Sequence, residues 1–288
     1  MIDLARKSSL GDNYFQLNID GNVYAFDSTT IDLCLSVFWW GEFRKTKGGI
    51  KLHTLYDIKT SIPSFIHVSA ASVHDMNAMD LLYYEPGSYH IFDRGYIDYA
   101  RLNRIDQSSA FFVARAKDNL QFQRFYSNKV CKGNGVLLDQ VERLTGFYVS
   151  KKYPQKLRRI KFYDEETDNE LEFLSNNLNL TSEEIAQLYK YRWKVELFFK
   201  WIKQHLKIKS FWGTSMNEVK IQVYSAIIAY CMVALVRNKL KVDCSTYEIL
   251  QILSISLLNK TPLNELLTNQ NYKDVKELYN KQLKISWN

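Results

Sequence analysis

The segment Tyr189-Lys190-Tyr191-Arg192-Trp193-Lys194-Val195-Glu196, which continues to Lys203, decides the reading of this 288-residue chain. At about 100° per residue, Tyr189, Arg192, Glu196 and Lys203 share an arc of about 60° on one helix. A carboxylate flanked on its own helix face by Arg and Lys suits a site that handles phosphate groups. The pattern therefore predicts one helix that carries a functional edge.

The same spacing also occurs on ordinary solvated helices, where each Glu–Lys or Arg–Glu pair contributes about 0.2–0.5 kcal/mol. An apolar stripe beside the polar arc argues against that interpretation. Its members are Leu188, Val195, Phe199, Ile202 and Leu206. Because such a stripe packs on a core, the polar arc should border a cleft. Thr181 and Glu184 are spaced as a capping box and mark the start of the helical region.

Two aspartates close apolar, β-prone runs elsewhere in the chain. Asp27 follows Val23-Tyr24-Ala25-Phe26, and Asp93 follows Tyr89-His90-Ile91-Phe92. An Asp at a strand end is often only a turn or cap residue, so each one alone is weak evidence. Together with Glu196 they would supply hard oxygen ligands of the kind that Mg²⁺ prefers. The three acids are far apart in sequence, as the residues of most catalytic sites are.

With Asp93-Arg94-Gly95-Tyr96 and the Tyr-x2-Arg-x3-Glu-x6-Lys spacing, the chain resembles the DDE transposases of bacterial insertion sequences, in the fourth insertion-sequence family. The resemblance runs from about Asn22 to about Leu240. It implies an α/β fold, with a ribonuclease-H-like mixed sheet flanked by helices, a β-rich insertion and a helical C-terminal part. It also implies cut-and-paste DNA transposition, with Asp27, Asp93 and Glu196 as catalytic residues that bind two Mg²⁺ or Mn²⁺ ions.

Several basic and aromatic residues are candidate DNA contacts. The resemblance assigns phosphate-binding roles to Arg192 and Lys203 and a supporting role to Tyr189. Further candidates are Lys200, Arg44, Lys45 and Lys47. Another cluster, which contains Lys151, Lys152, Lys156, Arg158, Arg159 and Lys161, fits either a DNA-contacting ribbon or a solvated charged hairpin. The sequence leaves both interpretations of this cluster open.

Composition is compatible with a polyanionic partner. The net charge is +7 and the isoelectric point is near 9.0, although an incidentally basic protein would look the same. Four scattered cysteines favour a reduced, cytoplasmic protein, and the apolar run 221–236 is short for a membrane span. We expect double-stranded DNA as the partner, at transposon ends and target. We also expect a homodimer in the synaptic complex, nucleoid-associated localisation in a bacterium, and neither a membrane nor a small-molecule substrate.

The chain divides into three expected parts: the first part of the core in 1–117, the insertion in 118–179, and the rest of the core with C-terminal helices in 180–288. Strands are expected to end at Asp27 and to lie near 50–55, 64–68, 89–93 and 110–114, with helices near 77–84 and 96–105. Thr167-Asp168-Asn169 is a hairpin signal between the runs 157–163 and 170–174.

Family members usually carry a helical DNA-binding region ahead of the first aspartate, and residues 1–21 are too short to form one. We therefore expect weak discrimination of transposon ends. The alternative function is a non-catalytic, truncated regulator that binds DNA or inhibits full-length transposase. A general nuclease is a weaker alternative, because it does not need the whole Tyr-Arg-Glu-Lys arc.

Overall fold

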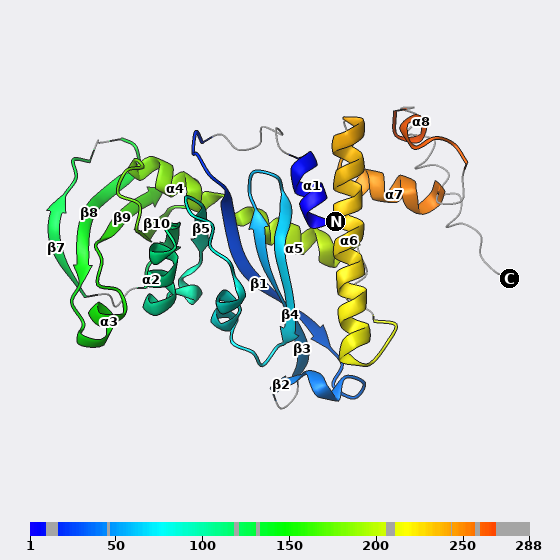
Figure 1. The fold of residues 1–288 in the computed structure, drawn as a ribbon, viewed down its shortest axis with the longest axis horizontal. Coiled ribbons are helices and arrows are strands. Elements are labelled where there is room, and N and C mark those ends of the chain that lie inside the picture. Colours follow the sequence, from blue (N-terminus) through cyan, green and yellow to red (C-terminus); the bar gives the residue numbers. More distant parts are fainter. Residues whose placement is uncertain are drawn as a thin grey trace.

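The sheet is built outward from β1 (Val23–Leu33), whose β-branched and aromatic residues favour an extended strand. In the computed structural model, residues 1–9, 17–44, 47–117, 121–130, 133–205, 211–242, 244–256 and 260–268 are described. Ten strands form one sheet in the order β2-β3-β1-β5-β6-β10-β9-β8-β7, with β4 paired to β3 (Figure 1). β1, β5 (Tyr89–Phe92) and β6 (Phe111–Arg115) are parallel and the other pairs are antiparallel. The predicted mixed α/β fold is confirmed.

The remaining strands are β2 (Glu42–Arg44), β3 (Lys47–Asp57), β4 (Ile62–Ala70), β7 (Phe122–Ser127), β8 (Val136–Leu144), β9 (Leu157–Asp164) and β10 (Asn169–Ser175). The short strand β2 was not predicted. The predicted hairpin is confirmed: β9 and β10 pair across a turn in which Asp168 has φ 51°. Because β10 also pairs with β6, the strands of 118–179 continue the central sheet directly.

The helices are α1 (Ile2–Ser8), α2 (Tyr99–Gln107), α3 (Phe147–Lys152), α4 (Ser182–Lys190), α5 (Trp193–His205), α6 (Met216–Leu240), α7 (Thr246–Ser256) and α8 (Leu263–Thr268). Three short 3₁₀ helices are η1 (Trp39–Gly41), η2 (Asp75–Leu81) and η3 (Arg94–Tyr96). The helix expected near 77–84 is therefore wrong, since that stretch is mostly the 3₁₀ turn η2. The helix expected at 96–105 begins three residues later, after η3.

Alternation along β1 directs its side chains into two separate cores. Val23 and Ala25 pack with residues of α4, α5 and α6 on one face of the sheet. Tyr24 and Phe26 pack with residues of η2 and α2 on the other face. Because side chains of a strand alternate between faces, Asp27 follows Ala25 onto the face that α5 covers.

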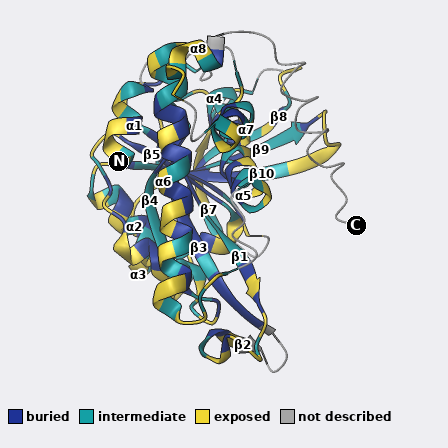
Figure 2. Cartoon of the chain, turned by 90° about the vertical axis from the view of Figure 1, so that its right-hand side faces the viewer, coloured by how far each residue is buried: buried dark blue, intermediate teal, exposed yellow. Residues whose placement is uncertain are grey.

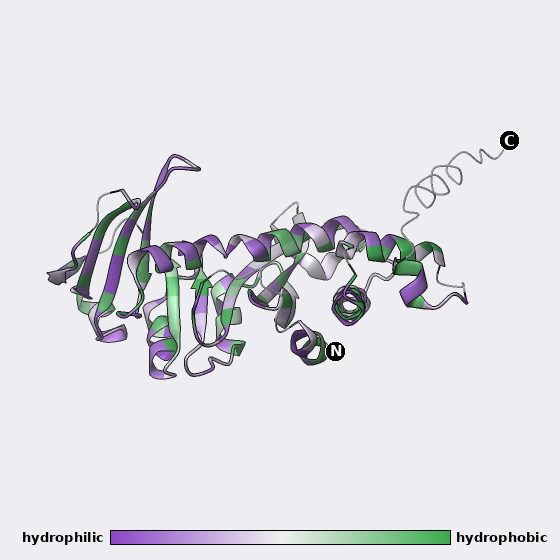
Figure 3. Ribbon diagram, turned by 90° about the horizontal axis from the view of Figure 1, so that it is seen from above, coloured by the Kyte–Doolittle hydropathy of each residue, from purple (hydrophilic) through white to green (hydrophobic). Residues whose placement is uncertain are grey.

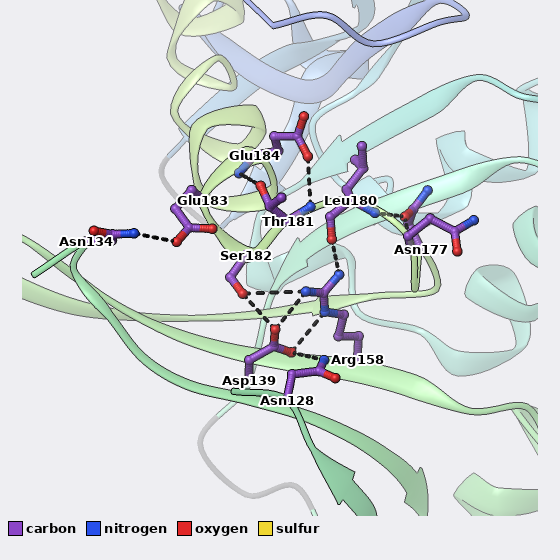
Figure 4. A network of polar contacts seen from close by, with 11 residues as sticks. Asn128, Asn134, Asp139, Arg158, Asn177, Leu180, Thr181, Ser182, Glu183 and Glu184 are labelled. Carbon is purple, nitrogen blue, oxygen red and sulfur yellow. Dashed lines mark hydrogen bonds and ion pairs between the residues drawn. The ribbon is translucent and has the colours of Figure 1, made fainter. Parts of the chain in front are cut away.

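A buried polar network fixes the start of α4 against the far part of the sheet (Figure 4). The Arg158 guanidinium forms an ion pair with Asp139 at 2.7 Å, and it donates to the carbonyl of Leu180. Ser182 donates to the same Asp139 carboxylate at 2.7 Å. The predicted capping box of Thr181 and Glu184 is present. These contacts set the direction in which α4 leads toward the centre of the sheet.

Helix α6 carries much of the C-terminal part. It packs on α1, β4, α5 and α7, and buried positions run along its length beside exposed ones (Figure 2). Its apolar residues are spread over the helix (Figure 3). By length and composition alone α6 could cross a membrane, and half of that apolar window is buried inside the protein.

Candidate active site

Asp27 and Asp93 lie at the same level of two neighbouring parallel strands. Val23 pairs with Tyr89 and Ala25 pairs with Ile91, so continuing this register by two residues places Asp27 beside Asp93. Neighbouring strands are about 4.8 Å apart. The parallel register therefore brings together two acids that are 66 positions apart in the sequence.

Asp27 lies in the middle of β1, so the prediction that it closes the strand is wrong. On one side β3 continues past it, with Asp27 paired to Thr54. On the other side β5 ends at Phe92, and Asp93 follows directly as the residue before η3. β5 is therefore paired with β1 only ahead of Asp27, and the sequence of β1 alone gave no sign of this difference.

The predicted single helix through Tyr189 and Lys203 is also wrong, because the chain breaks between α4 and α5. At the break, the amide of Lys194 bonds to the carbonyl of Tyr191 at 3.0 Å and that of Val195 bonds to Arg192 at 3.2 Å. These bonds span three residues and mark a tightened turn. The tertiary contacts of the Arg192 side chain hold this turn in place.

Arg192 bridges two of the predicted carboxylates. Its Nη1 donates to Asp27 Oδ2 at 3.1 Å, and its Nη2 donates to Glu196 Oε1 at 2.5 Å. The Arg192 side chain is 16% exposed, and its Nε is buried without a hydrogen-bond partner. The guanidinium thus holds a carboxylate from β1 and one from the first turn of α5 around a single positive charge.

Asp93 is held by the end of α4. The hydroxyl of Tyr189 donates to Asp93 Oδ1 at 3.2 Å. Arg192 lies 5.7 Å from the centre of the Tyr189 ring. Tyr189, Arg192 and Glu196 therefore converge on the two aspartates as predicted, although they come from two helices and the break between them.

The Asp27 carboxylate is largely desolvated. Burial raises its pKa from 3.8 to about 6, against the opposing effects of the Ser28 amide and the Arg192 charge, while Glu196 and Asp93 raise it further. Its Oδ1 accepts from the Ser28 amide at 2.8 Å and from the Tyr96 hydroxyl at 3.3 Å. Such a carboxylate carries a charge that its surroundings do not fully balance, which favours a nearby cation.

Behind Asp27, a polar chain crosses to η2. The Tyr96 hydroxyl also donates toward Ser28 Oγ at 3.2 Å, and Ser28 Oγ donates to Asp75 Oδ1 at 2.6 Å. Lys51 pairs with the same Asp75 oxygen at 3.1 Å. His53 Nδ1 lies 4.0 Å from it, and burial lowers the pKa of His53 to about 4. Sequence analysis assigned none of these residues to the site, although Tyr96 belongs to the quoted motif.

A cavity of about 480 Å³ opens beside Asp27 and Glu196. It is lined by Asp27, Ser28, Thr29, Glu196, Phe199, Lys200, Lys203 and Gln204. Lys203 Nζ donates to Thr29 Oγ1 at 2.6 Å and to the carbonyl of Thr30 at 2.8 Å, so it ties α5 to β1 as well as bordering the cavity. Predicted residue Lys200 lines the same cavity.

The other predicted DNA contacts are not placed by the structure. Arg44 ends β2 and Lys47 begins β3, but their side chains are not described, and Lys45 lies outside the described residues.

The donor chemistry of the three acids fits a hard divalent cation, and the raised pKa of Asp27 shows that negative charge there is poorly balanced. Within the described part of the chain, no three His, Cys, Asp or Glu side chains are arranged closely enough to hold a metal ion together. Arg192 occupies the space between Asp27 and Glu196. A shared metal site would need that guanidinium to move.

Comparison with known proteins shows the family of the chain. A family model described as "Transposase DDE domain" matches residues 19–232. A putative transposase, y4zB, of Sinorhizobium fredii is 37% identical over 210 residues, which cover 72% of this chain and 58% of the relative. The probable transposase for insertion sequence element IS5377 of Geobacillus stearothermophilus is 27% identical over 214 residues, 72% of this chain and 54% of the relative.

The putative transposase for insertion sequence element IS4SA of Synechocystis is 25% identical over 217 residues, which cover 74% of this chain and 60% of the relative. The chain thus matches somewhat more than half the length of each of these curated relatives. The matched region contains the three acids and the residues that join them. By this match over most of its length, the chain belongs to the DDE transposase domain family, whose members typically use divalent metal ions.

Proposed function

We propose that this chain carries the catalytic centre of an insertion-sequence transposase and performs metal-dependent DNA strand cleavage and strand transfer. The observation that supports this most directly is the bridge from Arg192 to both Asp27 and Glu196, with Asp93 directly after the adjoining strand. The bridge holds two acids on one basic fork, and both of these acids line a solvent-accessible cavity. A carboxylate with a raised pKa beside a specific charge partner and a cavity is typical of functional sites.

In this proposal Asp27, Asp93 and Glu196 would hold two Mg²⁺ or Mn²⁺ ions. The ions would activate the attacking oxygen and stabilise the leaving 3′-oxygen. Tyr189 orients Asp93 through its hydroxyl. Arg192, released from the carboxylates, offers a planar fork to a phosphate, while Lys200 and Lys203 supply positive charge along the cavity.

The proposed substrate is double-stranded DNA, at the ends of the element and at its target, acted on by a homodimer in the bacterial nucleoid. Arg44, Lys45 and Lys47 are proposed as further backbone contacts near β2 and β3. A DNA phosphate bound at this site would attract the Arg192 guanidinium away from Asp27 and Glu196. The two carboxylates would then need another cation, which the metal ions would provide.

The test is cleavage of a labelled duplex that carries the element's end sequence, with Mg²⁺, Mn²⁺ or EDTA. Asp27→Asn should abolish cleavage, because the amide keeps the shape but loses the charge. Asp32→Asn is the matched control, since Asp32 is an exposed aspartate on the same strand and its change should leave cleavage intact. Cleavage by Asp27→Asn in EDTA would refute the mechanism. DNA binding without any cleavage by the native chain would instead favour the regulator.

A further inference from the structure

In the part of the chain that contains β7, β8 and α3, the acidic residues are buried and the basic residues are exposed. Among the described residues of 121–156 there are two acids, Asp139 and Glu142, and both are buried, at 3% and 2% exposure. The described basic residues of the same stretch are Arg124, Lys129, Arg143, Lys151, Lys152 and Lys156, and all six are exposed. The surface charge of this stretch is therefore entirely positive.

Both acids are used inside the protein. Asp139 accepts from Arg158, Ser182 and Asn128, as Figure 4 shows. Glu142 is 3.6 Å from Arg159, which also pairs with Glu172 at 2.7 Å. Neither carboxylate is available to neutralise the exposed lysines.

The same contacts separate the six-cation run 151–161 into two groups. Arg158, Arg159 and Lys161 are paired with Asp139, Glu172 and Glu170, respectively, and belong to the structure of the sheet. Lys151, Lys152 and Lys156 form no ion pair with a carboxylate in the described part of the chain. Arg158 is buried, so neither interpretation from the sequence applies to it, whereas both stay open for Lys151, Lys152 and Lys156.

Aromatic side chains are exposed among these unpaired cations. Phe125 and Tyr126 on β7 are 49% and 48% exposed, and Phe147 and Tyr148 on α3 are 67% and 77% exposed. Lys151 Nζ lies 4.1 Å from the centre of the Phe147 ring. Lys156 Nζ lies 4.9 Å from that of Phe125, which links the segment after α3 to β7. These rings restrain the lysine head groups without neutralising them.

The opposite end of the same strands has the opposite character. Phe122 pairs with Leu144 and Glu142 pairs with Leu157, so the start of β7, the end of β8 and the start of β9 meet beside α3. The other end of β9 leads into a turn with the exposed acids Glu165, Glu166 and Asp168. Exposed acids are thus found at this end of β9, where the exposed Lys129 also lies, and not beside α3.

We propose that the α3 surface, defined as Arg124, Arg143, Lys151, Lys152 and Lys156 with the four exposed rings, binds the sugar-phosphate backbone of duplex DNA. The inference rests on the proposed function, and it adds a DNA contact apart from the cavity beside Asp27. Restrained cations with no carboxylate partner match a polyanion, and apolar rings tolerate the sugar face. Binding here is independent of base sequence, because it neutralises phosphates.

The experiment measures duplex affinity against salt by fluorescence anisotropy, in the catalytically inactive Asp27→Asn chain so that DNA is not consumed. Each lost phosphate contact lowers the slope of log K against log salt by about 0.9. Lys151→Ala with Lys152→Ala should therefore lower it by about 1.8. When the salt concentration is raised fourfold, the loss of DNA affinity should therefore be roughly twelvefold smaller for the double variant than for its parent.

Lys161→Ala is the matched control, because Lys161 is paired with Glu170 on the same sheet and should leave the slope nearly unchanged. Circular dichroism verifies that each variant is folded. An unchanged slope in the folded double variant would overturn the inference. Binding of poly-glutamate is measured in parallel. If the double variant lost poly-glutamate binding but kept duplex binding, the surface would instead fit an acidic protein partner, and the inference would also be overturned. Failure of the proposed function appears separately, as no metal-dependent cleavage by the native chain whatever the slope.

Discussion

Replacing Arg192 by Met tests whether the guanidinium and a divalent cation compete for the same carboxylates. Arg192→Met keeps a long side chain and removes the charge between Asp27 and Glu196. Removing one partner of a buried ion pair costs about 3–5 kcal/mol. The Glu196 side chain is 32% exposed, so its share is small, and we expect the lower end, about 3 kcal/mol.

The assay is thermal unfolding with EDTA and with increasing MnCl₂. At about 2–4 °C per kcal/mol, the metal-free variant should melt roughly 6–12 °C below the native chain. Mn²⁺ should restore most of this loss, because a ligand at one hundred times its Kd contributes about 2.7 kcal/mol. The variant should also bind Mn²⁺ more tightly than the native chain, in which the ion must first displace Arg192.

Lys190→Met is the control, since Lys190 is a cation at the end of α4 that pairs with Asp164 away from the cavity. Its small loss of stability should not respond to Mn²⁺. The competition argument fails if Arg192→Met binds Mn²⁺ more weakly than the native chain, because that result would make Arg192 a support for the metal site.

Three further outcomes follow from the same contacts. Asp27→Asn should stabilise the metal-free protein by about 2–3 kcal/mol at pH 7.5, because the pKa of Asp27 is about 6 in the folded protein and 3.8 otherwise, so folding disfavours its charged form. Urea unfolding at several pH values measures this difference in stability. The difference between the variant and the native chain should vanish below about pH 4, where Asp27 is protonated in both the folded and the unfolded states. Tyr96→Phe should weaken Mn²⁺ binding about tenfold in an electron paramagnetic resonance titration, since Asp27 loses an orienting donor, whereas unchanged affinity would assign Tyr96 to packing alone. Lys203→Ala should lower the salt slope of DNA binding by about one and also cost about 1–3 kcal/mol, because its bonds to Thr29 and Thr30 join α5 to β1.

Sequence patterns predicted the elements whose side chains follow a simple period. The apolar run before Asp93 and the hairpin signal at Asp168 are read directly from neighbouring residues, and both are found in the structure. The position of Asp27 within β1 was mispredicted because strand ends depend on the partner strand. Here β3 continues beside Asp27 while β5 stops, and no local pattern in β1 records that difference.

Sequence patterns selected the acidic residues of the candidate site but not the residues that hydrogen-bond around Asp27. Helical spacing placed Arg192 beside Glu196, and the family resemblance grouped Asp27 and Asp93 with them. Ser28 and Asp75 could not be found this way, because their hydrogen bond joins residues 47 positions apart in an ordinary strand and a 3₁₀ turn. Their proximity is a property of the folded sheet.

The break between α4 and α5, which the sequence did not predict, positions the Arg192 side chain. A continuous helix would satisfy its own backbone, but a tightened turn at Tyr191 and Arg192 lets one guanidinium reach both Asp27 on the sheet and Glu196 one turn along α5. Without a cation, that pair of carboxylates would repel each other in a desolvated site. In the proposed function, Arg192 would therefore supply the positive charge that holds the two acids together until metal and DNA bind.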